Sequence, residues 1–328
     1  MKPVIYVMIV TGIIAVIVPL FADLYLYSIL TTVLIWIMLG QAWNLLGGFT
    51  GQISFGHAMF LAIGAYSSMI ITNSLNLDMI LTLLVGGLFA GLFSFPLGLL
   101  IFRLKGPYFA LATLAFAEIL HIVARNWKGL TNGGEGMMLS NNATFLGIEI
   151  FSNDEYFFVA LLLAAIVSLS CYYLMKTKAG YSFIAIRENQ DAAEAMGINS
   201  TRTKSTALFF SAFLAGVAGG FYGLYNKFID PEMTLTVHMS AEMIFVTVLG
   251  GIGTILGPVI GSTILITLQE YLKEVPMFQS FSSLYLVIYG LFIMIIIVYL
   301  PGGIIDGIKK IRQYFSKGGD ESDYSKSG

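Results

Sequence analysis

The chain has 328 residues, of which 57% are hydrophobic and 11% charged, and its formal net charge is −2. Soluble domains carry about 25% charged residues, so this chain has too few charged side chains to form a soluble surface. The composition excludes a disordered, coiled-coil, nucleic-acid-binding or ordinary cytosolic protein and indicates a chain that is embedded in the lipid of a membrane. The small net charge gives no reason to expect a nucleic-acid partner. The single cysteine, Cys171, permits neither an internal disulfide nor a cysteine-based metal cluster.

Predicted membrane-spanning segments are runs of about 20 mostly apolar residues, the length that crosses the hydrocarbon core. In chain order they cover 4–21, 26–46, 54–73, 79–102, 107–127, 156–175, 205–226, 240–273 and 281–300. A Gly/Pro break interrupts 240–273, which therefore either crosses twice or forms a re-entrant hairpin. The predicted fold class is all-α, a polytopic transmembrane helix bundle of about ten segments, or about eight crossings plus a re-entrant hairpin. The first segment lacks a clear signal-peptide cleavage site and is expected to be a retained helix.

Basic side chains predict which ends of the segments face the cytoplasm. Most of the 17 lysine and arginine residues fall on one face, and those on the other face are Arg125, Lys128, Lys227 and Lys273. The basic face is therefore predicted to be cytoplasmic, with both termini on it. The regions expected are a transmembrane domain over 1–305, with a cytoplasmic loop at 177–203 and an external loop at 128–155, and a cytoplasmic tail over 306–328.

Motifs for nucleotide binding and catalysis are absent from the sequence. There is no G-x-x-x-x-G-K-[ST] loop, so the chain is not expected to hydrolyse ATP itself. His57, His121 and His238 lie far apart and have no H-E-x-x-H companion, so we expect no metal site and no cofactor. Without a Ser-His-Asp or G-x-S-x-G pattern, hydrolysis has little support, and the chain is not expected to be an enzyme.

Two glycine-rich breaks interrupt the apolar segments, one early and one late in the chain. They read GGFTGQISFGH over 47–57 and GGIGTILGP over 250–258. Backbone of this kind survives at membrane depth only inside protein or beside a watery cavity. Paired breaks indicate a translocation path in a transporter, and a cytoplasmic turn between two helices explains each of them equally well. The broken-helix glycines are Gly47, Gly48, Gly51, Gly250, Gly251, Gly253 and Gly257.

Polar side chains inside predicted spans form a second set of candidates. Glu118, His121 and Arg125 are spaced i, i+3 and i+7 and make one polar stripe on a helix. A charge in the bilayer costs at least about 2.5–3.5 kcal/mol on insertion scales, so the stripe should face protein or water. It either lines a polar path or forms an interhelical hydrogen bond, with Glu118 paired to His121. The path candidates are Gln41, Asn44, Gln52, Ser54, His57, Glu118 and His121.

Other spacings predict packing. Ala212, Gly216 and Gly220 recur every four residues, so they share a helix face that another backbone can approach closely. His238 and Glu242 are four residues apart near the predicted external end of their segment, where they are most simply an interfacial pair.

The cytoplasmic loop contains a predicted short amphipathic helix, RENQDAAEAMG over 187–197. Ala192, Ala193 and Met196 would form a small apolar face, Arg187 and Asp191 an i,i+4 pair, and Gly197 a C-terminal stop. A helix that lies on lipid headgroups should be basic with bulky apolar anchors, whereas this one is acidic with alanines. Docking into a groove on a partner is the better interpretation. The residues expected to couple to that partner are Arg187, Glu188, Asp191, Ala192, Ala193, Met196 and Gly197.

The run Asp191-Ala192-Ala193-x-x-x-Gly197 resembles the EAA…G loop of ABC-importer permeases, with Asp replacing the leading Glu and without the usual Leu-Pro that follows. More of the chain resembles the branched-chain amino acid permeases of the LivM type. The matching stretches, within roughly 40–300, are WNLLGGFTGQISFGHA at 43–58, GAY at 64–66, AEI at 117–119, TNGGEG at 131–136 and GGIGTILGP at 250–258.

This resemblance implies an importer in the plasma (inner) membrane, built from several subunits. The expected partners are two ABC ATPase subunits docked on the coupling helix, a second homologous permease subunit, an extracytoplasmic substrate-binding protein and membrane lipid. Leucine, isoleucine and valine are the implied cargo, and relatives in the same family move urea, short amides or other amino acids. The rival interpretation is an ion-coupled secondary transporter that uses Glu118 as its ion site.

Overall fold

The computed structural model describes residues 14, 18–19, 23–104, 106–140, 142–274, 284–300 and 302–307. The predicted first segment, 4–21, lies outside the described residues except for three positions, as does the tail beyond residue 307. Within the described part, seven helices are long and apolar enough to cross a membrane, and shorter apolar helices accompany them. The predicted all-α polytopic bundle is therefore confirmed.

The long helices follow the predicted spans in order. Those described are α2 Leu24–Gly47, α3 Ala58–Leu75, α4 Met79–Ile101, α5 Pro107–Asn126, α7 Asn153–Met175, α10 Ser200–Asn226, α12 Val237–Gly251, α13 Leu256–Glu274 and α15 Leu284–Tyr299. The region 240–273 divides at its break into α12 and α13, which pack against each other. α3 begins later than residue 54, because the glycine-rich backbone ahead of it stays extended.

Short elements fill the connections. They are α6 Lys128–Thr131, the 3-10 helix η1 Gly133–Glu135, β1 Met137–Met138, β2 Thr144–Phe145, β3 Ile148–Glu149, α8 Lys178–Glu188, α9 Gln190–Ala195, β4 Phe228–Ile229 and α11 Pro231–Thr234. β1 pairs with β4, and β2 pairs with β3, both antiparallel.

The predicted helix over 187–197 is wrong in one respect, because the helix is interrupted at Asn189, between α8 and α9. The side chain of Asn189 caps α9 by accepting a hydrogen bond from Ala192 N–H at 3.0 Å. Arg187 and Asp191 thus lie on different helices.

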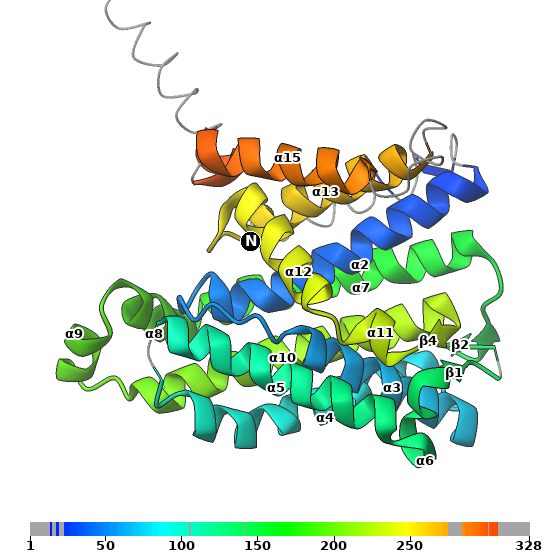
Figure 1. The fold of residues 1–328 in the computed structure, drawn as a ribbon, viewed down its shortest axis with the longest axis horizontal. Coiled ribbons are helices and arrows are strands. Elements are labelled where there is room, and N and C mark those ends of the chain that lie inside the picture. Colours follow the sequence, from blue (N-terminus) through cyan, green and yellow to red (C-terminus); the bar gives the residue numbers. More distant parts are fainter. Residues whose placement is uncertain are drawn as a thin grey trace, which may run out of the picture.

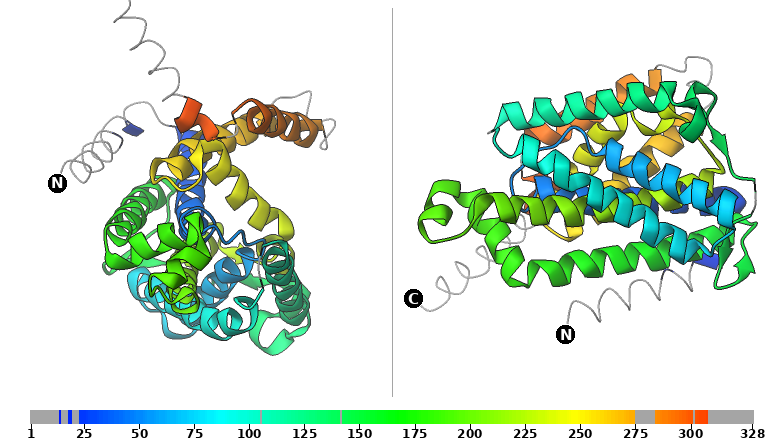
Figure 2. Two further views of the ribbon diagram at one scale, coloured as in Figure 1. Left: turned by 90° about the vertical axis from the view of Figure 1, so that its left-hand side faces the viewer. Right: turned by 90° about the horizontal axis from the view of Figure 1, so that it is seen from below.

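The bundle has two distinct ends (Figure 1). α8 and α9 project at one end, here called the α9 end, and the short strands gather at the other, here called the strand end. α15 packs against α12 and α13, and α13 packs on α2, so this group lies on the opposite side of α2 from α3 and α4 (Figure 2). α5 is the least buried of the seven long apolar helices.

α10 forms the centre of the bundle, where it packs on α2, α3 and α4. The predicted small-residue face explains the closeness of these contacts. A Cβ added at Gly216 would lie 2.6 Å from the Cβ of Ala90 and 2.9 Å from the Cα of Gly87, and one at Gly220 would lie 2.8 Å from a methyl group of Leu83. In lipid, van der Waals contact of this kind supplies much of the helix association, so larger side chains here would separate the helices.

Candidate functional site

The two glycine-rich breaks meet at the α9 end of the bundle. Asn44, in the last turn of α2, joins them: its Oδ1 accepts a hydrogen bond from Gly253 N–H at 2.9 Å, and its Nδ2 donates to the carbonyl of Thr254 at 2.8 Å. One turn earlier, Gln41 Nε2 donates to the carbonyl of Ile255 at 2.6 Å. Two polar side chains of α2 thus satisfy the backbone that links α12 to α13, far away in the sequence.

Arg187 connects this junction to α8. Its Nη1 donates to the carbonyl of Gly48 at 3.2 Å, and its Nη2 pairs with Glu188 Oε1 at 2.7 Å. A Cβ added at Gly253 would lie 2.6 Å from Arg187 Nη1, so the guanidinium touches both breaks. The guanidinium therefore lies where a displacement of α8 would be transmitted to both α2 and the α12–α13 turn.

Glycine is required by geometry at this junction. Gly51, Gly251 and Gly253 have φ values of +70°, +136° and +71°, a region that side-chain-bearing residues rarely adopt. At Gly48 the reason is space, because an added Cβ would lie 2.7 Å from the amide nitrogen of Gly253. We call the region formed by residues 47–51, 250–257 and the side chains of Gln41, Asn44 and Arg187 the glycine junction.

The rest of the first break runs extended into the bundle, and side chains satisfy its backbone. Trp43 Nε1 donates to the carbonyl of Ser54 at 2.8 Å, and Phe55 N–H donates to Thr113 Oγ1 at 3.1 Å. His57 Nε2 lies 2.7 Å from Ser211 Oγ. From Ser54 onward this stretch lies mostly inside protein, one of the two environments in which a broken helix survives at membrane depth, whereas Ile53 is exposed.

The structure separates the predicted path candidates into two groups. Gln41, Asn44, Ser54 and His57 are fully buried and hold the breaks in place, and Gln52 lies partly exposed beside them. Glu118 and His121 are elsewhere, on α5, so the structure does not bring all candidates to one surface.

On α5 the predicted polar stripe meets a partner that the sequence did not indicate. Glu118 Oε1 lies 3.6 Å from His121 Nδ1, as proposed for a local pair. Glu232, on α11, lies 3.5 Å from His121 Nε2 and 3.1 Å from Arg125 Nη1. Asp230-Pro231-Glu232 is a helix-start pattern, in which Asp230 caps α11, and it predicts a short helix here but not that Glu232 contacts α5.

The side chain of Glu118 is 55% exposed, near the middle of α5. Its surroundings on the surface are apolar, because Leu111, Ile119 and Ile122 are exposed on the same helix. An ionised side chain at this depth is costly against lipid, so this face of α5 requires protein or water next to it.

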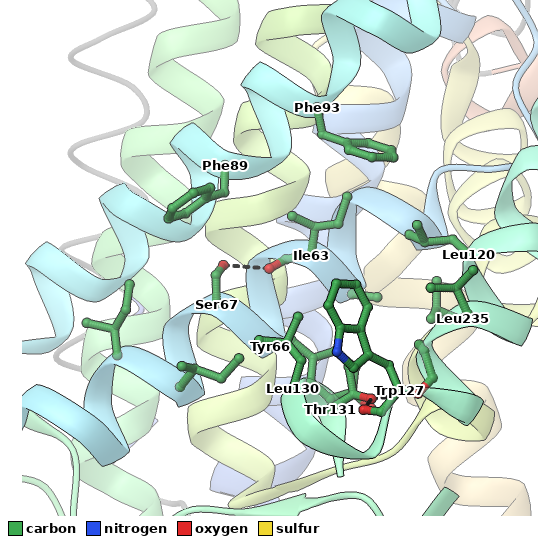
Figure 3. Close-up of a pocket in the computed structure, with 15 residues that line it drawn as sticks. Ile63, Tyr66, Ser67, Phe89, Phe93, Leu120, Trp127, Leu130, Thr131 and Leu235 are labelled. Atoms are coloured by element: carbon green, nitrogen blue, oxygen red, sulfur yellow. Dashed lines mark hydrogen bonds between the residues drawn. The ribbon is translucent and has the colours of Figure 1, made fainter. Parts of the chain in front are cut away.

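An apolar cavity of about 460 Å³ lies on another side of α5, between α3, α4 and the loop that follows α5 (Figure 3). Ile63, Phe89, Phe93, Leu120 and Trp127 line it. The hydroxyl of Ser67 donates to the carbonyl of Ile63 at 2.5 Å, so one of the few polar side chains of the wall is already hydrogen-bonded. The cavity suits an aliphatic group and offers little to a charged one.

No group of three or more His, Cys, Asp or Glu side chains that could hold a metal ion occurs in the described part of the chain. The described part of the chain is a bundle with seven helices long and apolar enough to cross a membrane, and this defines a multi-pass membrane protein.

Comparison with known proteins assigns the family. Residues 25–298 match the model of the branched-chain amino acid transport system / permease component family, and the chain belongs to this family. It is 29% identical to the high-affinity branched-chain amino acid transport system permease protein LivM of Escherichia coli (strain K12) and to that of Salmonella typhimurium, over 85% of this chain and 69% of either relative. It is 25% identical to LivH of Escherichia coli (strain K12), over 82% of this chain and 90% of that protein. No solved structure matches the chain.

Proposed function

We propose that this chain is a permease subunit of an ATP-driven ABC importer for leucine, isoleucine and valine in the plasma membrane. The family and the names of the LivM and LivH relatives support the cargo. The distribution of basic residues supports an orientation with the α9 end and both termini in the cytoplasm. The chain moves cargo and hydrolyses no ATP, which is the task of two partner ATPase subunits.

The α8–α9 segment docks the ATPase. α9 stands out from the bundle (Figure 1), and Met196 beside it is 85% exposed, whereas Ala193 faces inward and is buried. Gln190 anchors α9 to α10, because its Oε1 accepts a hydrogen bond from Lys204 Nζ at 2.8 Å. An exposed apolar side chain on an anchored short helix suits insertion into a groove on a partner.

The observation that carries the coupling proposal is the contact of Arg187 with both glycine breaks. When the ATPase subunits close on ATP, they displace α8 and α9, and Arg187 transmits that displacement to the end of α2 and to the α12–α13 turn. Motion of these helices against the α10 centre opens the path alternately to each side of the membrane.

The exposed polar face of α5 lies against the second permease subunit and forms one wall of the path. Glu118 supports this assignment, since its exposed carboxylate requires a polar neighbour at membrane depth. Cargo reaches the strand end from an extracytoplasmic binding protein.

The test is reconstitution of the chain with its second permease, ATPase and binding protein in liposomes. Leucine accumulation should require ATP and should persist when ionophores collapse all ion gradients. Accumulation by the chain alone, or accumulation that stops when the gradients collapse, would establish the rival ion-coupled transporter.

A further inference from the structure

A second cavity, of about 600 Å³, lies among α2, α10, α11, α12, α13 and α15, toward the strand end. We call it the polar chamber. Unlike the apolar cavity beside α5, it has charged side chains in its walls, together with aromatic ones. The residues that matter for its chemistry are Trp36, Tyr222, Tyr225, Glu242, Glu270 and Lys273. Its volume falls within the range of about 300–1,000 Å³ that is usual for small-molecule sites, and is far larger than a bare metal ion requires.

The charges of the chamber leave one buried carboxylate in excess. Lys273 Nζ pairs with Glu270 Oε1 at 2.7 Å, and Glu232, also in the wall, pairs with Arg125 at 3.1 Å. Each of these pairs is neutral. Glu242 is the remaining acid, and its side chain is 5% exposed. The charge of Lys273 also attracts it, although the hydrogen-bonded partner of Lys273 is Glu270.

Among the described residues, Glu242 contacts weak partners. The hydroxyl of Tyr289 donates to its Oε1 at 3.4 Å, at the long end of hydrogen-bond distances. Nδ1 of His238 lies 3.6 Å from its Oε2, and a histidine carries a positive charge only when protonated. The predicted interfacial pair of His238 and Glu242 is thus present, but it leaves much of a buried carboxylate's hydrogen-bonding capacity unused. A buried carboxylate is costly unless a cation or several donors face it.

We propose that the polar chamber binds the primary ammonium group of a small organic amine, with Glu242 as its counter-ion. A primary ammonium has three N–H donors, which match the capacity that Tyr289 and His238 leave open on the carboxylate. Trp36, Tyr222 and Tyr225 supply aromatic faces, which attract organic cations. The amine is the ammonium end of the imported amino acid, and only this last assignment rests on the proposed function.

The chamber is connected to the path of the proposed importer. Glu232 belongs to the wall of the chamber and also contacts His121 and Arg125 on α5. α11, which carries Glu232, also carries Met233 into the same wall. An amino acid that leaves the binding protein would therefore first be held by its ammonium group beside α11, and then pass to the α5 face.

The experiment measures binding to the assembled transporter in lipid nanodiscs, without the binding protein. The probes are L-leucine, 3-methylbutylamine, which keeps the amine, and 4-methylpentanoate, which keeps the carboxylate. We expect leucine and 3-methylbutylamine to compete with each other, and 4-methylpentanoate to bind at least tenfold more weakly. Glu242→Gln should weaken both amine ligands at least tenfold, and Glu242→Asp should weaken them less. Glu149→Gln, an exposed acid on β3, is the matched control and should change nothing.

The assembly of each variant is checked by size-exclusion chromatography, so that a folding defect in Glu242→Gln is recognised and Glu242→Asp then carries the test. Equal binding of 4-methylpentanoate, unchanged affinity in a folded Glu242 variant, or full competition by sodium or potassium ions would overturn the proposal. If 3-methylbutylamine binds while leucine is not transported, the chamber stands and the cargo assignment fails. If leucine is transported but neither amine binds, the chamber fails and the proposed function stands.

Discussion

The two ends of this bundle are built in opposite ways. At the α9 end, side chains of α2 and α8 form hydrogen bonds with the backbone of the two glycine-rich breaks. The absence of a side chain at Gly48 and Gly253 lets the two breaks approach closely. Toward the strand end, the helices separate around a chamber whose walls carry charges. In the proposed importer this difference follows from the task of each end. The end that receives force needs unbroken contact, and the end that receives cargo needs space.

The largest effect is expected from filling the glycine junction. In Gly250→Leu the new side chain would collide with the carbonyl of Gly257 and lie 2.8 Å from the amide nitrogen of Gly261, both of them backbone atoms that cannot move aside easily. Overpacking of this kind costs about 1–3 kcal/mol, so the variant should unfold at a clearly lower temperature than the unchanged protein. Thermal unfolding in detergent measures this. Gly290→Leu, at a glycine of α15 with open space around it, is the control, and equal stability of the two variants would contradict the described packing.

The next effect concerns transmission through Arg187. Arg187→Ala removes the hydrogen bond to Gly48 and the contact at Gly253. A hydrogen bond to a charged group is worth about 1.5–3 kcal/mol, so uptake should fall about tenfold or more while ATP hydrolysis by the complex continues. Arg187→Lys should recover part of the loss. The control is Arg202→Ala, an exposed arginine at the start of α10. Equal losses of uptake and hydrolysis would point to failed assembly rather than failed transmission.

A smaller effect is expected at the docking surface itself. Gly197 has a φ of +88° and no atoms near the position of an added Cβ, so the side chain in Gly197→Trp would project from the segment that is proposed to contact the ATPase. Uptake should fall several-fold with normal membrane insertion and continued ATP hydrolysis. Gly106→Trp is the matched control, because Gly106 also has positive φ (+56°) and open space but lies between α4 and α5. If Gly197→Trp transports as well as Gly106→Trp, α9 is not the docking element.

The smallest effect is expected at Glu118. Exposed ion pairs are worth about 0–1 kcal/mol, so Glu118→Gln should lower uptake by about twofold at most. The pH dependence of uptake should stay unchanged, since in the proposed importer Glu118 lines the path and carries no proton across. Uptake measured between mildly acidic and mildly basic pH tests this. A variant that loses pH-dependent transport would favour the ion-coupled mechanism.

Hydrophobic runs were enough to predict the helices, because apolar length is a local property of the sequence. The break over 47–57 was predicted from its glycines, but the predicted span that begins at residue 54 starts too early, since Ile53 and Phe55 give this stretch the composition of a helix while Gly51 and Gly56 and its side-chain partners decide its conformation. The site was predicted only in part. Gln41 and Asn44 share a helix face, but their bonding partners lie more than 200 residues further along the chain. Glu232 sits in a short connection, and nothing in its neighbourhood of the sequence points to α5.

The contact of α10 with α3 has a consequence for how the molecule can change shape. The backbones of Gly64 and Gly216 touch, as do those of Gly219 and Leu61, so no side chain lies between the two helices at these levels. Helices whose backbones are in direct contact cannot slide past one another unless they first move apart, because the atoms of one backbone would collide with those of the other. α3 and α10 therefore form a rigid pair that keeps its arrangement through each transport cycle of the proposed importer. In the proposed importer, rearrangement is then left to the other helices, with α2, α12 and α13 moving against this pair.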